Sequence, residues 1–175
     1  MSYFVTGATG FIGKRLVKKL LARRNAVVYF LIRPESRDKV PDLLDFWGAD
    51  EARAVPVVGD LVTPLLGVSK SDIKKLKGKV EHFFHLAAVY DLKADAESQV
   101  AINIEGTKNA VALANEIDAG IFQHVSSIAA AGLYEGVFRE DMFEEADGLD
   151  HPYFATKHES EKIARTEASM PWRVY

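Results

Sequence analysis

Tyr153 and Lys157 stand four residues apart in a Y-x-x-x-K pattern. On a helix this spacing places both side chains on one face. A tyrosine with its usual pKa of about 10 is a poor base at neutral pH, and a neighbouring ammonium favours its phenolate form. The pair therefore indicates a proton donor for a carbonyl oxygen whose carbon receives hydride from a nicotinamide. Found alone, the pattern is more typical of a surface helix.

Two consecutive hydroxyl groups, Ser126 and Ser127, follow the apolar run that begins at Ile121. Ligands of open α/β sheets bind at the carboxyl ends of the strands, so a hydroxyl there could orient and polarise a substrate oxygen. The order glycine turn, serine pair and Y-x-x-x-K makes a chance match of the last motif improbable.

Three glycines at Gly7, Gly10 and Gly13 form a G-x-x-G-x-x-G pattern between an apolar run and an amphipathic segment. Glycines permit a tight turn and bring backbone N–H groups close to a pyrophosphate at the positive end of a helix dipole. The intervening Thr9, Phe11 and Ile12 are expected to join this cofactor site. The alternative is an ordinary glycine-rich turn.

Arg33 occupies the position about 20 residues beyond these glycines, where a dinucleotide site presents a group to the adenosine ribose. A guanidinium can bind a 2′-phosphate bidentately, which favours NADP(H) over NAD(H). The nearby Glu35 weakens this argument, and the alternative is a solvated surface arginine.

Strand-length apolar runs alternate with amphipathic segments, which predicts a doubly wound parallel sheet of the Rossmann type. Predicted helices begin near Gly10 and run to about Arg24, with an apolar stripe containing Ile12, and cover 96–117 and 153–168. We expect a loop over 135–150. The predicted strands are Tyr3–Thr6, Val27–Ile32, Ala54–Val58, His82–Leu86 and Ile121–Ser126, with another beginning at Trp172.

Composition narrows the function classes. The chain has 175 residues, 48% of them hydrophobic, which fits one globular domain. A net charge of −3 gives no general attraction to nucleic acid, and no apolar stretch is long enough to cross a membrane. With no secretory signal at the start, a cytoplasmic location is expected. The absence of cysteine excludes thiolate chemistry, and the five histidines show no metal-binding spacing.

Four stretches carry a resemblance to the extended short-chain dehydrogenase/reductase family, and within it to bacterial fatty acyl-CoA reductases that also reduce fatty aldehydes. These stretches are 85–91, 125–132, 138–143 and 151–162, with the last containing Tyr153 and Lys157. The resemblance implies NADPH as cofactor and an acyl or aldehyde substrate. Anchored on Gly132, it assigns Ser127 as the catalytic serine and Ser126 as the last residue of its strand.

The same resemblance assigns further roles. Lys157 would hold the nicotinamide ribose, and Asn103 would support the central helix. Tyr90 and the loop over 135–150 would lie near the substrate. The cofactor would also contact the turn residues after the third and fourth strands, Asp60, Leu61, Ala87 and Ala88. Asp60 could equally cap a local turn.

The end of the chain, Trp172 to Tyr175, is expected to be the start of a strand in a truncated sheet, with most of the substrate-binding region beyond it. Residues 1–175 would then be the NADP(H)-binding domain that carries Ser127, Tyr153 and Lys157. Two alternatives stay open: an NDP-sugar epimerase or dehydratase, and a non-catalytic NADP-binding domain. The sequence leaves homo-oligomerisation open.

Overall fold

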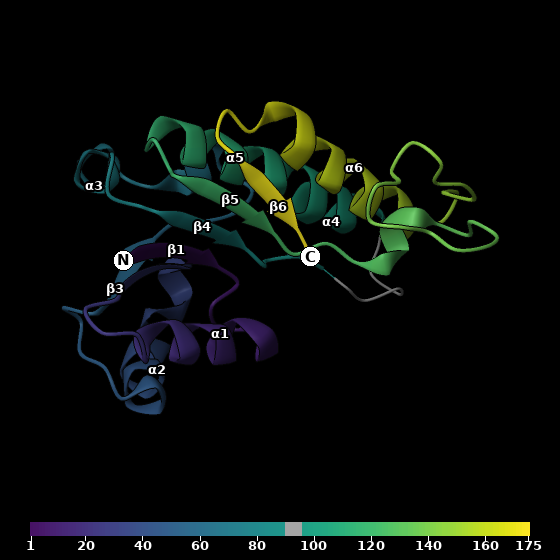
Figure 1. Cartoon of the computed structure of the whole chain (residues 1–175). Helices are drawn as coiled ribbons and strands as arrows, with labels where there is room; N and C mark the ends of the chain where they lie inside the picture. Colours follow the sequence, from purple (N-terminus) through teal and green to yellow (C-terminus); the bar gives the residue numbers. More distant parts are fainter. Residues whose placement is uncertain (90–95) are drawn as a thin grey trace.

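Six parallel strands form one sheet in the computed structural model, which describes residues 1–89 and 96–175. The strands stand in the order β3-β2-β1-β4-β5-β6, which is the Rossmann order and confirms the predicted doubly wound fold (Figure 1). The strands are β1 (Ser2–Thr6), β2 (Val27–Ile32), β3 (Ala54–Val58), β4 (His82–His85), β5 (Ile121–His124) and β6 (Trp172–Val174).

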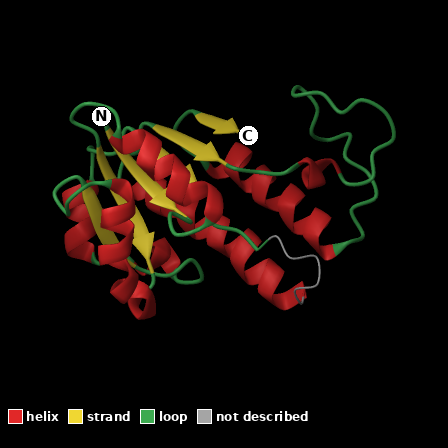
Figure 2. Cartoon of the chain, turned by 90° about the horizontal axis from the view of Figure 1, so that it is seen from below, coloured by secondary structure: helices red, strands yellow, loops and turns green. Residues whose placement is uncertain are grey.

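Helices cover both faces of this sheet (Figure 1). The helices α1 (Phe11–Leu21) and α2 (Val40–Trp47) lie on one face. The opposite face carries α3 (Lys70–Leu76), α5 (Gly106–Glu116) and α6 (Pro152–Glu167), and α4 (Ala96–Gln99) lies in the same layer (Figure 1). Figure 2 shows the same layers from below, with long loops at the side where the strands end.

Alternating side chains of the strands supply two hydrophobic cores. On β1, Tyr3 and Val5 face α1 and α2, whereas Phe4 faces α5 and α6. Phe4 stacks on Phe83 at 4.7 Å, and Phe83 stacks on Phe122 at 5.4 Å. All three phenylalanines are fully buried, and each such burial is worth roughly 1.5–3 kcal/mol. This aromatic row fixes the register of the three central strands directly below the site.

Two helix predictions need correction. The first helix begins next to Gly10 as predicted, but it ends at Leu21 instead of near Arg24. Ile12 is 62% exposed and does not belong to the buried stripe, because it lies in the first turn of this helix and borders an open cavity. The predicted helix over 96–117 is divided by a π-helical segment, Val100–Glu105, between α4 and α5. Such π-bulges are frequent at functional sites.

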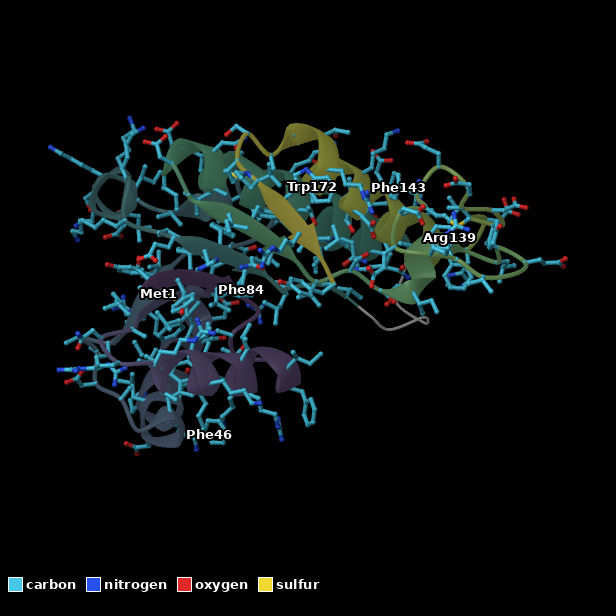
Figure 3. The ribbon with its side chains drawn as sticks, in the orientation of Figure 1. Met1, Phe46, Phe84, Arg139, Phe143 and Trp172 are labelled. Carbon is cyan, nitrogen blue, oxygen red and sulfur yellow. The ribbon has the colours of Figure 1, made fainter. Side chains whose placement is uncertain are left out.

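The strands β4 and β5 end one and two residues earlier than predicted, at His85 and His124. After each of these two strands the backbone continues into a loop that borders the site. The segment 135–150 contains no helix or strand, as predicted (Figure 1). This segment returns to the fold through Phe143, which stacks on His158 of α6 at 4.3 Å (Figure 3).

Candidate active site

The glycine turn between β1 and α1 is packed too closely for side chains. Gly7 has a φ of +72°, and a Cβ on it would lie 2.8 Å from the Ala87 nitrogen. A Cβ on Gly13 would lie 2.0 Å from the Gly7 oxygen. The Gly10 N–H donates to the Gly7 carbonyl at 3.1 Å, which closes the turn. The N-terminus of α1 is left facing open space, and this arrangement suits a pyrophosphate.

A cavity of about 810 Å³ extends from this turn along the carboxyl edge of the sheet. All the predicted cofactor-contacting residues line it. They are Gly7, Thr9, Gly10, Phe11, Ile12, Gly13, Arg33, Asp60, Leu61, Ala87, Ala88, Tyr153 and Lys157. The cavity therefore joins the glycine turn to the Tyr–Lys pair, and its volume is within the range of cofactor sites. That these lining residues contact a cofactor stays a prediction.

The adenosine end of the cavity carries more polar groups than sequence reasoning found. Ser36 and Lys39 line it together with Arg33. Both belong to the 3₁₀ segment Pro34–Lys39 that follows β2. Arg33 Nε lies 3.2 Å from Glu35 Oε1, and both side chains are 62% exposed. Two cations therefore border this end, one of them paired with an exposed carboxylate. The sequence offers two further basic residues after Arg33, Arg37 and Lys39, and its pattern does not show which of them reaches the cavity.

Asp60 makes the local turn contacts that its sequence context allowed, and its contact with a cofactor stays a prediction. Its carboxylate accepts the Val62 N–H at 3.1 Å, and its own N–H donates to the Leu66 carbonyl at 2.8 Å. The residue also lines the cavity. The local turn therefore holds Asp60 at the cavity wall.

Tyr153 and Lys157 lie in the first two turns of α6, where His151 accepts the Tyr153 N–H at 3.1 Å as an N-cap. Lys157 is only 3% exposed, and its Nζ donates to the Val125 carbonyl at 3.3 Å. Burial lowers the pKa of Lys157 from 10.5 to about 8, although the Glu161 carboxylate acts in the opposite direction. A buried cation thus lies beside the tyrosine, inside the cavity that begins at the glycine turn.

The two serines differ in their hydrogen bonds. Ser126 lines the cavity, but its hydroxyl donates to Glu161 at 2.8 Å. Glu161 is also paired with Arg165 at 2.7 Å. Ser127 is not among the cavity-lining residues; its Oγ accepts the Ala129 N–H at 3.2 Å and caps the segment Ile128–Ala131. Within the described residues the Ser127 hydroxyl proton has no acceptor. The structure therefore leaves the Ser127 hydroxyl without an acceptor among these residues but does not place it in the cavity lining, and its contact with a substrate oxygen stays a prediction.

Asn103 lies in the π-helical segment and is 1% exposed. Its Oδ1 accepts the Val89 N–H at 2.8 Å, and its Nδ2 donates to the Val89 carbonyl at 3.1 Å and to Thr156 Oγ1 at 3.2 Å. Asn103 thus ties the turn after β4 to α6 next to Lys157, which agrees with the supporting role expected of it. Tyr90, predicted near the substrate, lies outside the described residues.

Neither a metal centre nor a membrane span is found in the ranges 1–89 and 96–175. No three side chains of His, Asp or Glu in these ranges are grouped so that they could hold a metal ion. None of the helices there has both the length and the apolar character needed to cross a bilayer.

Fold and site together define a nucleotide-binding domain of an oxidoreductase. The chain belongs to the NAD-binding family described as male sterility protein, whose family model matches residues 5–175. This match confirms the resemblance to extended short-chain dehydrogenases/reductases with fatty acyl-CoA reductase homologues.

The curated relatives are much longer than this chain. The chain is 29% identical over 186 residues to a linear gramicidin synthase protein of Brevibacillus parabrevis, covering 98% of this chain and 4% of that protein. It is 28% identical over 142 residues to fatty acyl-CoA reductase 2 of Mus musculus, covering 72% of this chain and 28% of that reductase. The chain therefore spans well under half the length of these curated relatives.

Solved structures share the fold over nearly the whole chain. The terminal R domain from the myxalamid PKS-NRPS biosynthetic pathway has a TM-score of 0.83 and 27% identity, covering 99% of this chain and 47% of that one. UDP-glucuronic acid 4-epimerase from Bacillus cereus has a TM-score of 0.76 and 24% identity, covering 99% and 55%. The epimerase likeness shows the fold alone.

Proposed function

We propose that this chain is the cofactor-binding and catalytic part of an NADPH-dependent reductase that acts on a fatty acyl-CoA or fatty aldehyde and yields the alcohol. The observation that carries the proposal is that one cavity is lined by the glycine turn at one end and by Tyr153 and Lys157 at the other. A dinucleotide lying between these ends would have its pyrophosphate on α1 and its nicotinamide beside the tyrosine.

The bound nicotinamide would supply hydride to the carbonyl carbon. An aldehyde needs one such transfer, whereas an acyl-CoA thioester needs two, from two NADPH molecules, with the CoA thiol leaving after the first. Tyr153 would donate its phenolic proton to the carbonyl oxygen as negative charge develops there. The Lys157 ammonium would stabilise the resulting phenolate and hold the ribose hydroxyls. Ser127 would donate its hydroxyl hydrogen to the same substrate oxygen and orient it. Burial of Lys157 strengthens its interaction with the phenolate because water does not screen it.

NADPH is the proposed form of the cofactor. Arg33 and Lys39 give the adenosine end two cations, and the Ser36 hydroxyl could donate to the same 2′-phosphate. Arg33→Asp should lower the affinity for NADPH and raise the relative affinity for NADH, because a carboxylate repels the phosphate. Binding constants for both nucleotides measure this preference, and an unchanged preference for NADPH would refute the assignment.

The substrate is proposed from the family. Relatives named as fatty acyl-CoA reductases and an R domain of a peptide–polyketide pathway share this domain. Tyr90 and the loop over 135–150 would border the acyl group, and most of the substrate-binding region would lie beyond this chain. We further propose a cytoplasmic protein without nucleic acid partners.

The deciding experiment measures NADPH oxidation by the full-length protein with long-chain aldehydes and acyl-CoA thioesters. In parallel it measures the conversion of NDP-sugars by product analysis, because epimerases and dehydratases consume no net NADPH. Turnover with aldehydes or thioesters is expected. Activity with NDP-sugars alone would replace this proposal by the epimerase or dehydratase alternative, and NADPH binding without any turnover would indicate a non-catalytic domain. Tyr153→Phe should lower kcat by about 10²-fold or more with NADPH affinity nearly unchanged, because it removes only the transferable proton.

A further inference from the structure

A chain of buried hydrogen bonds runs beneath the active site from the end of β1 to α5, through the imidazole of His85. We propose that His85 is a positioning residue, which holds the turn over 86–89 between the glycine turn and α6 so that both ends of the cofactor cavity keep a fixed separation. The expected effect of His85 on kcat rests on the proposed reductase function. The expected effect of His85 on the position of segment 86–89 concerns the cofactor-free protein and does not depend on that function.

The first half of this series of hydrogen bonds joins His85 to the end of β1. His85 Nδ1 lies 2.8 Å from Thr6 Oγ1, and both residues are almost completely buried. The same oxygen accepts the backbone N–H groups of Leu86 and Ala87 at 3.2 and 3.3 Å. A hydroxyl oxygen has two lone pairs and one proton, so these two donors leave the hydroxyl proton for Nδ1. The Thr6 hydroxyl therefore donates to His85, and Nδ1 carries no proton.

The second half joins His85 to α5. His85 Nε2 lies 3.1 Å from Thr107 Oγ1, and this hydroxyl donates its proton to the Asn103 carbonyl at 2.7 Å. Because the Thr107 proton is already used, Thr107 can only accept from the ring. Nε2 therefore carries the proton, and the imidazole is the neutral Nε2–H tautomer. Every bond in the chain then has one donor and one acceptor.

A second proton on this imidazole has no acceptor, since Thr6 Oγ1 is fully used. The pKa of His85 agrees with this arrangement, because burial and the nearby Lys157 ammonium lower it to about 3. His85 consequently stays neutral across the pH range in which the enzyme would work. The hydrogen bonds through His85 therefore hold the connected segments in place and do not transfer protons.

Both ends of the chain meet residues of the cofactor cavity. Thr6 precedes Gly7, and Ala87 lines the cavity and lies against Gly7. At the other end, Asn103 clamps the backbone of Val89 with its amide and reaches α6. The segment 86–89 is therefore held at its start by the Thr6 hydroxyl, which His85 orients, and at its end by Asn103. Figure 1 shows that β1, β4, α5 and α6 are neighbours in space, which a connection of this kind requires.

A neighbouring histidine provides a matched control. His124 stacks on His85 with ring centroids 5.6 Å apart and is 2% exposed. Neither ring nitrogen of His124 has a hydrogen-bond partner among the described residues. The two rings thus share their burial and their stack, and they differ in whether they link other elements.

The test compares His85→Phe with His124→Phe, and Thr107→Val with Thr107→Ser, in the full-length protein. Five quantities are measured: folding by circular dichroism, amide hydrogen exchange at Leu86 and Ala87 without cofactor, NADPH affinity, and kcat and KM for the aldehyde. All four substitutions change the size of the side chain little. In each pair the first variant loses a hydrogen bond of His85, and the second keeps the hydrogen bonds of His85. Nitrogen NMR of the wild-type imidazole checks the Nε2–H tautomer directly.

We expect His85→Phe and Thr107→Val to accelerate exchange at Leu86 and Ala87 by about ten-fold, and to lower kcat by a similar factor with little change in aldehyde KM. His124→Phe should leave all these quantities unchanged, and Thr107→Ser should restore most of the loss. If His85→Phe fails to fold, Thr107→Val still decides the question.

Wild-type exchange and NADPH affinity in a folded Thr107→Val variant would overturn the proposal, as would an Nδ1–H tautomer of His85. Equal losses in His124→Phe and His85→Phe would also overturn it, because they would indicate ring packing as the cause. Absence of turnover in the wild type would count against the reductase function alone, since exchange and NADPH binding do not depend on the reaction.

Discussion

Replacing Lys157 by methionine should make the protein more stable while it destroys activity. Lys157 is 3% exposed, and among the residues that the structure describes its ammonium donates one hydrogen bond, to the Val125 carbonyl. Methionine has a similar length and no charge, so Lys157→Met removes the buried cation and keeps most of the packing. Stability and catalysis should therefore respond in opposite directions.

The size of the effect follows from the pKa of Lys157. Burial lowers it from 10.5 to about 8, a fall that corresponds to about 3 kcal/mol of destabilisation while the amine is charged. Leaving the Val125 carbonyl without its donor costs about 1 kcal/mol. The expected net gain in the free energy of unfolding at pH 7 is therefore about 2 kcal/mol.

This gain should depend on pH. Below pH 8 the amine is charged in both states, so the wild type carries the full penalty. Between pH 8 and 10.5 the folded protein loses the proton while the unfolded chain keeps it, so the wild type becomes relatively more stable as pH rises. The advantage of Lys157→Met should shrink across this window and reverse above it, where only the cost of about 1 kcal/mol for the unpaired Val125 carbonyl is left.

Urea unfolding of both proteins at pH 7 and at pH 10.5 measures the two differences, and NADPH oxidation measures activity. Lys162→Met, at an exposed position on the same helix, is the control and should change stability by no more than about 0.5 kcal/mol. A Lys157→Met variant that is less stable than the wild type at pH 7, or whose gain is the same at both pH values, would refute the reasoning.

Three further outcomes are expected. Gly13→Ala should abolish NADPH binding in titrations and lower the melting temperature, because its Cβ would lie 2.0 Å from the Gly7 oxygen; normal binding would contradict the packing of the turn. In pH–rate profiles, aldehyde reduction should decline above about pH 8 as the Lys157 ammonium loses its proton, and a flat profile to pH 9.5 would exclude this role. Glu35→Gln should tighten NADPH binding several-fold, since it frees Arg33 from its carboxylate partner; unchanged affinity would show that Arg33 does not bind the phosphate.

Local pattern determined much of the fold. The apolar runs predicted the first five strands, because a strand buried on both faces needs a nearly unbroken run of apolar residues. The start of the sixth strand was also predicted, at Trp172, although this edge strand is largely exposed. The short helices α2 and α3 were not predicted, since eight and seven residues are too few for a clear helical period. Their place is decided by packing on the sheet.

The sequence by itself determined the glycine turn and the Tyr–Lys pair, because backbone freedom at Gly7 and a spacing of four on a helix are local properties. Only the tertiary structure decided that Lys39 joins Arg33, that Ser126 is engaged by Glu161, and that His85 connects β1 to α5. The pairings of Ser126 and of His85 unite residues far apart in the chain, and Lys39 reaches the cavity only through the 3₁₀ segment that follows β2. They exist because parallel strands end at one edge of the sheet, and buried polar groups there must find hydrogen-bond partners among whatever elements meet them.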